Sequence, residues 1–428
     1  MNSAYRAQPI QDQVAAIRQG SISAVELAAQ VRTEIERREP DLAAWTVLSD
    51  DVPIQAQAQQ DAPEALPLRG VSVGIKDLID VAGLPSRAGS STTSAEPASE
   101  DAECVARLRG LGAVIQGKTV TTEFGYFAPG PTRNPYSADH TPGGSSSGSA
   151  AAVGAGTIPL ALGTQTAGSL TRPAAFCGAA GLVLTQGSTS LTGVCGLSPS
   201  LDSLGILTRT TEDLVHVYSA FSGQASSRAS SSPVANVLVW SGSGLGDVHP
   251  EMASLIEVLP DLLRGAGFGV ALLDWDDHVR TLTEDHHLVM AYEAAETLRA
   301  VEEVHREALS EPLRALLTQG RRIGDGERAS ALTRRDRSRD LLATMLGGST
   351  VVAGPAALGP APSGLAATGT PILSRAWQLL GCPVVTVPGA RSAENLPLGV
   401  QLIGQPGQET ALLEMATRVE PLLRANPT

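Results

Sequence analysis

The chain has 428 residues, of which 42% are hydrophobic and 18% are charged, so it can bury a large core, and its length alone would allow two or three domains. The formal net charge of −13 is spread along the sequence, which argues against nucleic acid or an anionic membrane surface as a direct partner. No apolar run reaches the roughly 18 residues of a spanning helix, and the first residues lack the apolar core of a signal peptide, so we expect a cytoplasmic protein that binds no membrane.

The cysteines and histidines do not indicate a metal site. The four cysteines, at positions 104, 177, 195 and 382, are spaced too irregularly for a zinc motif or a disulfide framework, so reduced thiols are expected. Only His286 and His287 are close in sequence, and no pair has the spacing that places two ligands on one helix face. We therefore expect neither a metal nor another cofactor.

The first half of the chain alternates strand and helix patterns. Ser23 and Glu26 have the spacing of a capping box, and the apolar residues after them predict a helix of roughly four turns outside the sheet. Residues 50–68 are typical of a loose helix and loop, and residues 71–75 of a short strand that ends at Lys76. A helix over 101–112 and a strand over 113–117 complete a β-α-β unit, which indicates the α/β class.

The second half begins with a change of composition. Residues 222–233 are a polar, low-complexity segment that is typical of a linker. A strand over 234–240, an amphipathic helix over 250–265 and a strand over 268–273 are predicted next, so a second β-α-β unit follows. Charged helices dominate from there to residue 345.

Residues 143–178 are the candidate catalytic segment, because they combine glycines and hydroxyl groups with hardly a charge. Ser145 and Ser169 each follow a glycine, and Lys76 stands upstream in an apolar run. Burial lowers the pKa of a lysine and lets the neutral amine act as a base, so a lysine and two serines can form a proton relay. The alternative is a flexible Gly/Ser linker, but residues 150–153 and 158–162 are apolar, as packed segments are.

This segment resembles the Gly/Ser-rich signature of the amidase signature family of serine amidohydrolases. Lys76 and Asp77, followed by residues 80–83, resemble the lysine motif of that family. Further similar segments are residues 117–119, 134–135, 200–205, 380–383 and 396–401, together with Arg209 and Asp213. The resemblance covers about residues 20–220 and 350–415 and is weak in between.

The resemblance implies an α/β fold with a single large domain, residues 1–428, in which helices flank a central mixed β-sheet. Residues 1–68 would be an N-terminal helical region and residues 69–221 the signature core. Residues 222–345, where family members differ most, are interpreted as a variable insert that gates the substrate. Residues 346–428 would complete the core.

The resemblance also assigns catalytic roles. Ser169 occupies the position of the nucleophile, Ser145 that of the bridging serine, which a cis peptide bond from Gly144 usually holds, and Lys76 that of the base. The backbone N–H groups of Thr166, Ala167, Gly168 and Ser169 would form the oxyanion hole.

Two departures from the family pattern lie in the loop before Ser169. Ala167 replaces a glycine, which matters only if this position requires a positive φ. Gln165 replaces an aspartate, and residues 183–185 replace a common Lys-Pro-Thr. All of these differences can also be neutral variation.

Arg172 says most about the substrate, because its spacing from Ser169 resembles that of malonamidase-like members. Its guanidinium could pair with a substrate carboxylate, or instead form an ion pair with an internal acidic residue. Gln165, Thr166 and Gly144 would supply further substrate contacts. Since only 3% of residues are aromatic, a long aryl or acyl tunnel has little support, and a small polar amide fits better.

Three functions remain open on the sequence. The favoured one is an amidohydrolase that converts a small carboxylate-bearing or urea-like amide to an acid and ammonia. The second is the glutaminase subunit of a tRNA-dependent amidotransferase, and the third is a scaffold of the same fold that binds without catalysis. The sequence does not fix the oligomeric state, and a homodimer is compatible with it.

Overall fold

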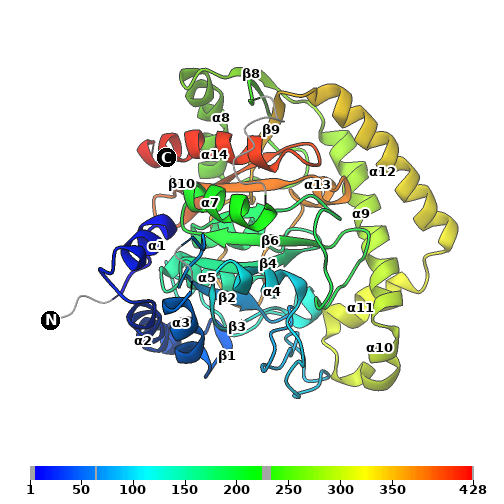
Figure 1. Cartoon of the computed structure of the whole chain (residues 1–428). Coiled ribbons are helices and arrows are strands. Elements are labelled where there is room, and N and C mark those ends of the chain that lie inside the picture. The colour runs from blue at the N-terminus through cyan, green and yellow to red at the C-terminus, as the bar shows by residue number, and fades with distance from the viewer. Residues whose placement is uncertain (1–4, 63–64, 224–232, 427–428) are drawn as a thin grey trace.

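A mixed β-sheet of 11 strands runs through the part of the chain that the structure describes, residues 5–62, 65–223 and 233–426 (Figure 1). This computed structural model orders the strands β1-β3-β2-β4-β6-β5-β10-β11-β9-β7-β8. Strands β3, β2 and β4 are parallel, as are β9, β7 and β8, whereas the pairs from β4 to β9 are antiparallel. The single α/β domain with a mixed sheet is therefore confirmed. The strands are β1 (Trp45–Leu48), β2 (Ser72–Lys76), β3 (Val114–Thr119), β4 (Leu160–Gln165), β5 (Ala180–Val183), β6 (Ser203–Thr208), β7 (Asn236–Val239), β8 (Gly269–Leu272), β9 (Thr350–Pro355), β10 (Val384–Arg391) and β11 (Pro397–Ile403).

Both faces of this sheet are buried, because successive side chains of a strand point to opposite faces. In β4, Leu160 and Leu162 join one core cluster, while Ala161 between them joins another. The first cluster also takes side chains from α1 (Ile10–Arg18), α4 (Glu103–Gly110), α7 (Thr211–Ser222), α8 (Pro250–Gly265) and α14 (Glu409–Ala425). The second takes them from α2 (Ala24–Leu42), α5 (Ser147–Ala155), α6 (Thr171–Cys177), α9 (Asp276–Thr297), α11 (Glu311–Gly320), α12 (Asp325–Leu346) and α13 (Arg375–Leu379).

The predicted β-α-β unit of the first half is present. Strand β2 ends at Lys76, helix α4 follows, and β3 pairs with β2 in parallel. The capping box before α2 is also present, since Ser23 Oγ accepts from the Glu26 N–H at 3.0 Å and Glu26 accepts from the Ser23 N–H at 2.9 Å. Helix α2 continues for 19 residues, longer than predicted, because polar residues beyond Ile35 end the apolar pattern without ending the helix. The loose helix of residues 50–68 is α3 (Val52–Gln60).

The second β-α-β unit is β7, α8 and β8, with β7 and β8 parallel and β8 at the edge of the sheet. The charged helices that follow are α9, α10 (Arg299–His305), α11 and α12. They stand together at one side of the molecule (Figure 1), where α11 and α12 pack against α9. Most of the predicted linker, residues 224–232, lies outside the described residues.

The described residues contain neither a membrane-spanning helix nor a metal cluster. None of their helices is both long enough and apolar enough to cross a bilayer. No group of three or more His, Cys, Asp or Glu side chains in these ranges could hold a metal ion. The four cysteines are free thiols, and all but Cys195 are buried.

Candidate active site

The candidate site lies where the parallel strands β2 and β4 end. The carboxyl ends of parallel neighbours meet at one edge of a sheet, so Lys76 at the end of β2 approaches Thr164 in β4. The turn before α5 carries Ser145 and Ser146, and the Ser146 N–H donates to the Ser169 carbonyl at 3.0 Å. Two parts of the Gly/Ser-rich segment are thereby brought to the same sheet edge.

The Lys76 amino group is surrounded by hydroxyl groups. Its Nζ lies 2.7 Å from Ser145 Oγ, 3.0 Å from Ser146 Oγ and 2.8 Å from Thr164 Oγ1. Lys76 is 0% exposed, and burial lowers the pKa of its amine well below the ordinary range, against an opposing effect of Asp202. A lysine in this environment can be neutral and accept a proton from Ser145.

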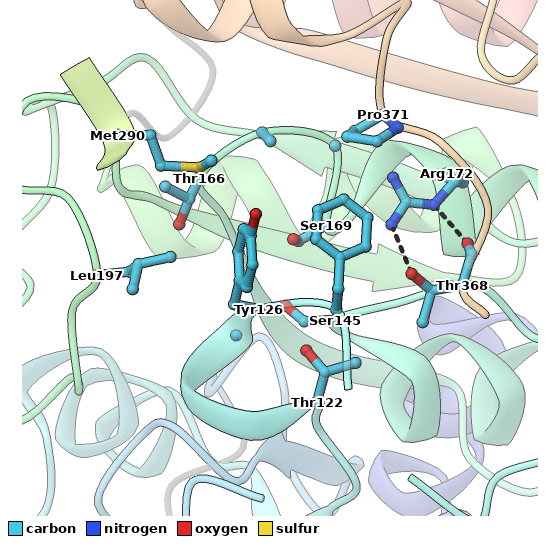
Figure 2. A pocket seen from close by; sticks show the side chains of 14 residues that line it. Thr122, Tyr126, Ser145, Thr166, Ser169, Arg172, Leu197, Met290, Thr368 and Pro371 are labelled. Atoms are coloured by element: carbon cyan, nitrogen blue, oxygen red, sulfur yellow. Dashed lines mark hydrogen bonds between the residues drawn. The ribbon is translucent and has the colours of Figure 1, made fainter. Parts of the chain in front are cut away.

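Ser169 shares a cavity with Ser145. The cavity has an empty volume of about 330 Å³ including its mouth, and Ser169, which is 8% exposed, forms part of its wall. Figure 2 shows the hydroxyl groups of Ser145 and Ser169 in this cavity. The peptide bond between Gly144 and Ser145 is cis, as the resemblance implied.

The loop between β4 and α6 holds the residues expected to form the oxyanion hole, Thr166 to Ser169. Thr166 Oγ1 donates to Asp202 Oδ1 at 2.5 Å. Burial raises the pKa of Asp202 to about 6, although hydrogen bonds from Thr166 and two backbone N–H groups act in the opposite direction. Ala167 is not among the described residues with a positive φ, so alanine causes no backbone strain there. Gly168 is required by close approach, since a Cβ would lie 2.9 Å from Pro371 Cβ.

Arg172, at the start of α6, lines the same cavity and is 3% exposed. Its Nε donates to the Thr368 carbonyl at 2.7 Å (Figure 2). Its Nη2 donates to the Gly144 carbonyl at 2.6 Å, while its buried Nη1 has no hydrogen-bond partner among the described residues. Among the described residues no carboxylate forms an ion pair with it, so the internal ion pair that was the alternative for Arg172 is absent. Burial and the nearby Arg375 lower the pKa of Arg172 to about 9.

The structure places two other expected substrate contacts differently. Gln165 is buried outside the cavity wall, where its Oε1 accepts from the backbone N–H groups of Leu170 and Thr171 at 3.0 Å and its Nε2 donates to Gln378. Both ends of its amide are thus occupied, the oxygen by the start of α6 and the nitrogen by Gln378, and a contact of Gln165 with substrate stays a prediction. Gly144 does not line the cavity either, and its carbonyl is an anchor for Arg172.

Several cavity residues escaped the sequence analysis. They come from the segment after β3, the segment between β5 and β6, helix α9 and the segment before α13, and they are Thr122, Gly125, Tyr126, Phe127, Leu197, Met290, Thr368 and Pro371. Helix α9 falls in the part of the chain where the resemblance is weak. A single methionine in such a region, here Met290, carries no sequence pattern that would place it at this cavity.

Comparisons with known proteins relate this chain to amidases in sequence and in fold. The model of the family named Amidase matches residues 26–413. A protein of Mycobacterium tuberculosis (strain ATCC 25618 / H37Rv) with the name "Putative amidase AmiA2" is 30% identical over 94% of this chain and 90% of its own length. A glutamyl-tRNA(Gln) amidotransferase chain of Thermus thermophilus is 39% identical, but over only 49% of this chain and 45% of its own. A crystal structure of an amidase superposes with a TM-score of 0.87 at 26% identity, covering 97% of this chain and 100% of that one.

Proposed function

The chain belongs to the amidase family, whose enzymes hydrolyse amide bonds, and from that premise we propose that it cleaves a small polar amide through Ser169, Ser145 and Lys76. The observation that carries the proposal is the fully buried Lys76, 2.7 Å from Ser145 at the wall of the cavity that contains Ser169. Burial of the amine supplies the base that a serine nucleophile needs.

In the proposed reaction Ser169 Oγ attacks the carbonyl carbon of the amide. Its proton passes to Ser145 Oγ, whose own proton passes to Lys76 Nζ. The backbone N–H groups of the loop before α6 stabilise the oxyanion of the tetrahedral intermediate. The C–N bond then breaks, and the leaving nitrogen takes the proton back through Ser145 to depart as ammonia. Water then attacks the acyl-Ser169 ester and gives a proton through Ser145 to Lys76. The bond between the acyl carbon and Ser169 Oγ breaks, Ser169 takes the proton back through Ser145, and the acid is released.

Arg172 supports a substrate that carries a carboxylate. The guanidinium is buried at the cavity wall, and within the described part of the chain it has no acidic partner and its Nη1 is an unused donor. An unpaired buried charge is costly, so a bound carboxylate that satisfies it would be favoured over a neutral group. Met290 of α9 lies in the same wall, which supports a role of the 222–345 insert in shaping access.

A second candidate is the glutaminase subunit of an amidotransferase, which the 39% identity to the amidotransferase chain of Thermus thermophilus favours over about half of this chain. Glutamine also carries both an amide and a carboxylate. Such a glutaminase would depend on a partner to use the ammonia, whereas a stand-alone amidase needs no second chain.

One experiment separates these functions. Ammonia release by the purified single chain is measured with malonamate, biuret, allophanate, glutamine and simple aliphatic and aryl amides, with Ser169→Ala as the control. We expect turnover of small carboxylate-bearing amides that Ser169→Ala lacks. Turnover of glutamine alone would indicate the glutaminase, and no ammonia from any of these amides would contradict the proposed hydrolase and favour a scaffold.

A further inference from the structure

A buried histidine from outside the signature segment contacts the loop that precedes Ser169. His286 lies in α9 and is fully buried. Its Nε2 lies 2.8 Å from the carbonyl oxygen of Thr166. The contact joins the 222–345 insert to the loop whose N–H groups are expected to form the oxyanion hole.

The other nitrogen of the ring fixes the tautomer. His286 Nδ1 lies 3.0 Å from Arg375 Nη1, and a guanidinium can only donate hydrogen bonds. Nδ1 must therefore accept, so the hydrogen of the neutral ring is on Nε2 and is donated to the Thr166 carbonyl. Burial, together with the charge of Arg375, holds the pKa of His286 well below the ordinary range and keeps the ring neutral.

The Thr166 carbonyl belongs to the same planar peptide group as the N–H of Ala167. An anchor on the carbonyl therefore also sets the direction of that N–H, and a hydrogen bond to the carbonyl polarises the peptide and strengthens the N–H as a donor. The Thr166 side chain is held separately, by Asp202 at 2.5 Å. Thr166 is thus held by two hydrogen bonds, one from His286 to its carbonyl oxygen and one from its side chain to Asp202.

We propose that His286, oriented by Arg375, is a positioning residue that aims the Ala167 N–H at the oxyanion formed during attack by Ser169. The inference rests on the proposed function, since it assigns no role without a reaction at Ser169. A positioning role of His286 predicts that its loss lowers the reactivity of Ser169 with little change in the binding of a probe or substrate. A purely structural role does not predict this difference.

The test uses the full chain and a small alkyl fluorophosphonate, so it does not depend on the identity of the amide. Ser169 Oγ forms a bond to phosphorus, the P–F bond breaks, fluoride leaves, and the hydroxyl proton passes to the relay. The phosphoryl oxygen gains negative charge where the oxyanion hole acts. The labelling rate is followed over a range of probe concentrations, which separates the maximal rate from probe binding, and the melting temperature is measured for each variant.

His286→Phe removes both hydrogen bonds and keeps a ring in the core. Because loss of an oxyanion donor typically costs 10²- to 10³-fold, we expect a misaimed one to slow the maximal labelling rate by about 10- to 100-fold. His287→Phe is the matched control, since the adjacent His287 points instead to Gln319 Oε1 at 3.0 Å. It should label at the wild-type rate.

Two further variants test the direction of the effect. His286→Gln retains a side-chain N–H that can donate to the Thr166 carbonyl, so it should recover part of the lost rate. Arg375→Met removes the donor that fixes the tautomer and should slow labelling as well. Combined with His286→Phe it should add little, because both changes act on one hydrogen bond.

Equal labelling rates in wild type and His286→Phe, whatever the melting temperature, would overturn the proposal. Equal losses in His286→Phe and His287→Phe would overturn it too, because they would reflect a general disturbance of α9. If His286→Phe does not fold, Arg375→Met is used instead. Labelling of Arg375→Met at the same rate as the wild type would then overturn the proposal. A wild-type chain that is not labelled at Ser169 would instead contradict the proposed function, so the two failures are distinguishable.

Discussion

Replacement of Arg172 by leucine tests the proposed substrate class. Leucine removes the unpartnered Nη1 donor and the positive charge from the cavity wall. A hydrogen bond to a charged group is worth about 1.5 to 3 kcal/mol. At about 1.4 kcal/mol per factor of ten, this predicts about a 10- to 150-fold larger loss of kcat/KM for a carboxylate-bearing amide than for its uncharged analogue.

The quantity to measure is the loss of kcat/KM for the carboxylate-bearing substrate divided by the loss for the neutral one, because Arg172 also stabilises the structure. Its Nε and Nη2 hold the carbonyls of Thr368 and Gly144, so leucine will weaken the cavity wall for both substrates. Ammonia release is measured with malonamate and with a neutral amide of the same size. Arg69→Leu is a matched control, because Arg69 is also buried and also holds two carbonyls, those of Gln59 and Gln60, away from the site.

We expect Arg69→Leu to lower the melting temperature without changing the ratio. If Arg172→Leu weakens both substrates equally, Arg172 is only a structural anchor. The carboxylate-bearing substrate would then be wrong, and a general small-amide hydrolase would remain.

Three further predictions concern the base and the loop. Lys76→Met should abolish ammonia release. Because burial lowers the pKa of Lys76 in the folded state, a pH–rate profile of the wild type should rise at pH values well below the ordinary lysine pKa. Melting curves should show Lys76→Met to be more stable than the wild type by an amount that shrinks as the pH rises towards the unfolded-state pKa of about 10.4. An active Lys76→Met variant would refute the relay. Gln165→Ala should lower the free energy of unfolding in urea by about 1 to 3 kcal/mol, because the N–H groups of Leu170 and Thr171 lose their acceptor. A change of substrate preference without destabilisation would show that Gln165 contacts the substrate rather than holding the start of α6. Ala167→Gly should keep the activity and lose only about 0.4 to 1 kcal/mol of stability, since Ala167 has no positive φ, whereas a large gain in activity would show that alanine strains the loop.

Local patterns in the sequence predicted the strand that carries Lys76. The alternation of apolar residues placed Lys76 at the end of β2, and the helix between β2 and β3 required those strands to be parallel. The strand order beyond β4 was not predictable in this way, because β6, β5 and β10 are joined by antiparallel pairs between residues far apart in the chain.

The site itself was predictable only where a motif marks it. Lys76, Ser145 and Ser169 carry the family resemblance, and the structure brings Lys76 to Ser145 at the cavity that Ser169 lines. The position of Gln165 outside the cavity wall was not predictable, because sequence cannot show that its side-chain oxygen accepts from the start of α6. The contact of His286 with Thr166 was not predictable, because the sequence places His286 beside His287 but does not show which element either side chain meets.

The most direct test of the account is ammonia release by Ser169→Ala, measured beside its melting curve on a substrate that the wild-type chain hydrolyses. Removal of one hydroxyl at the cavity wall empties no core, so the melting temperature should stay near that of the wild type while turnover falls to background. A folded Ser169→Ala chain that retains a substantial share of the wild-type rate would contradict Ser169 as the nucleophile.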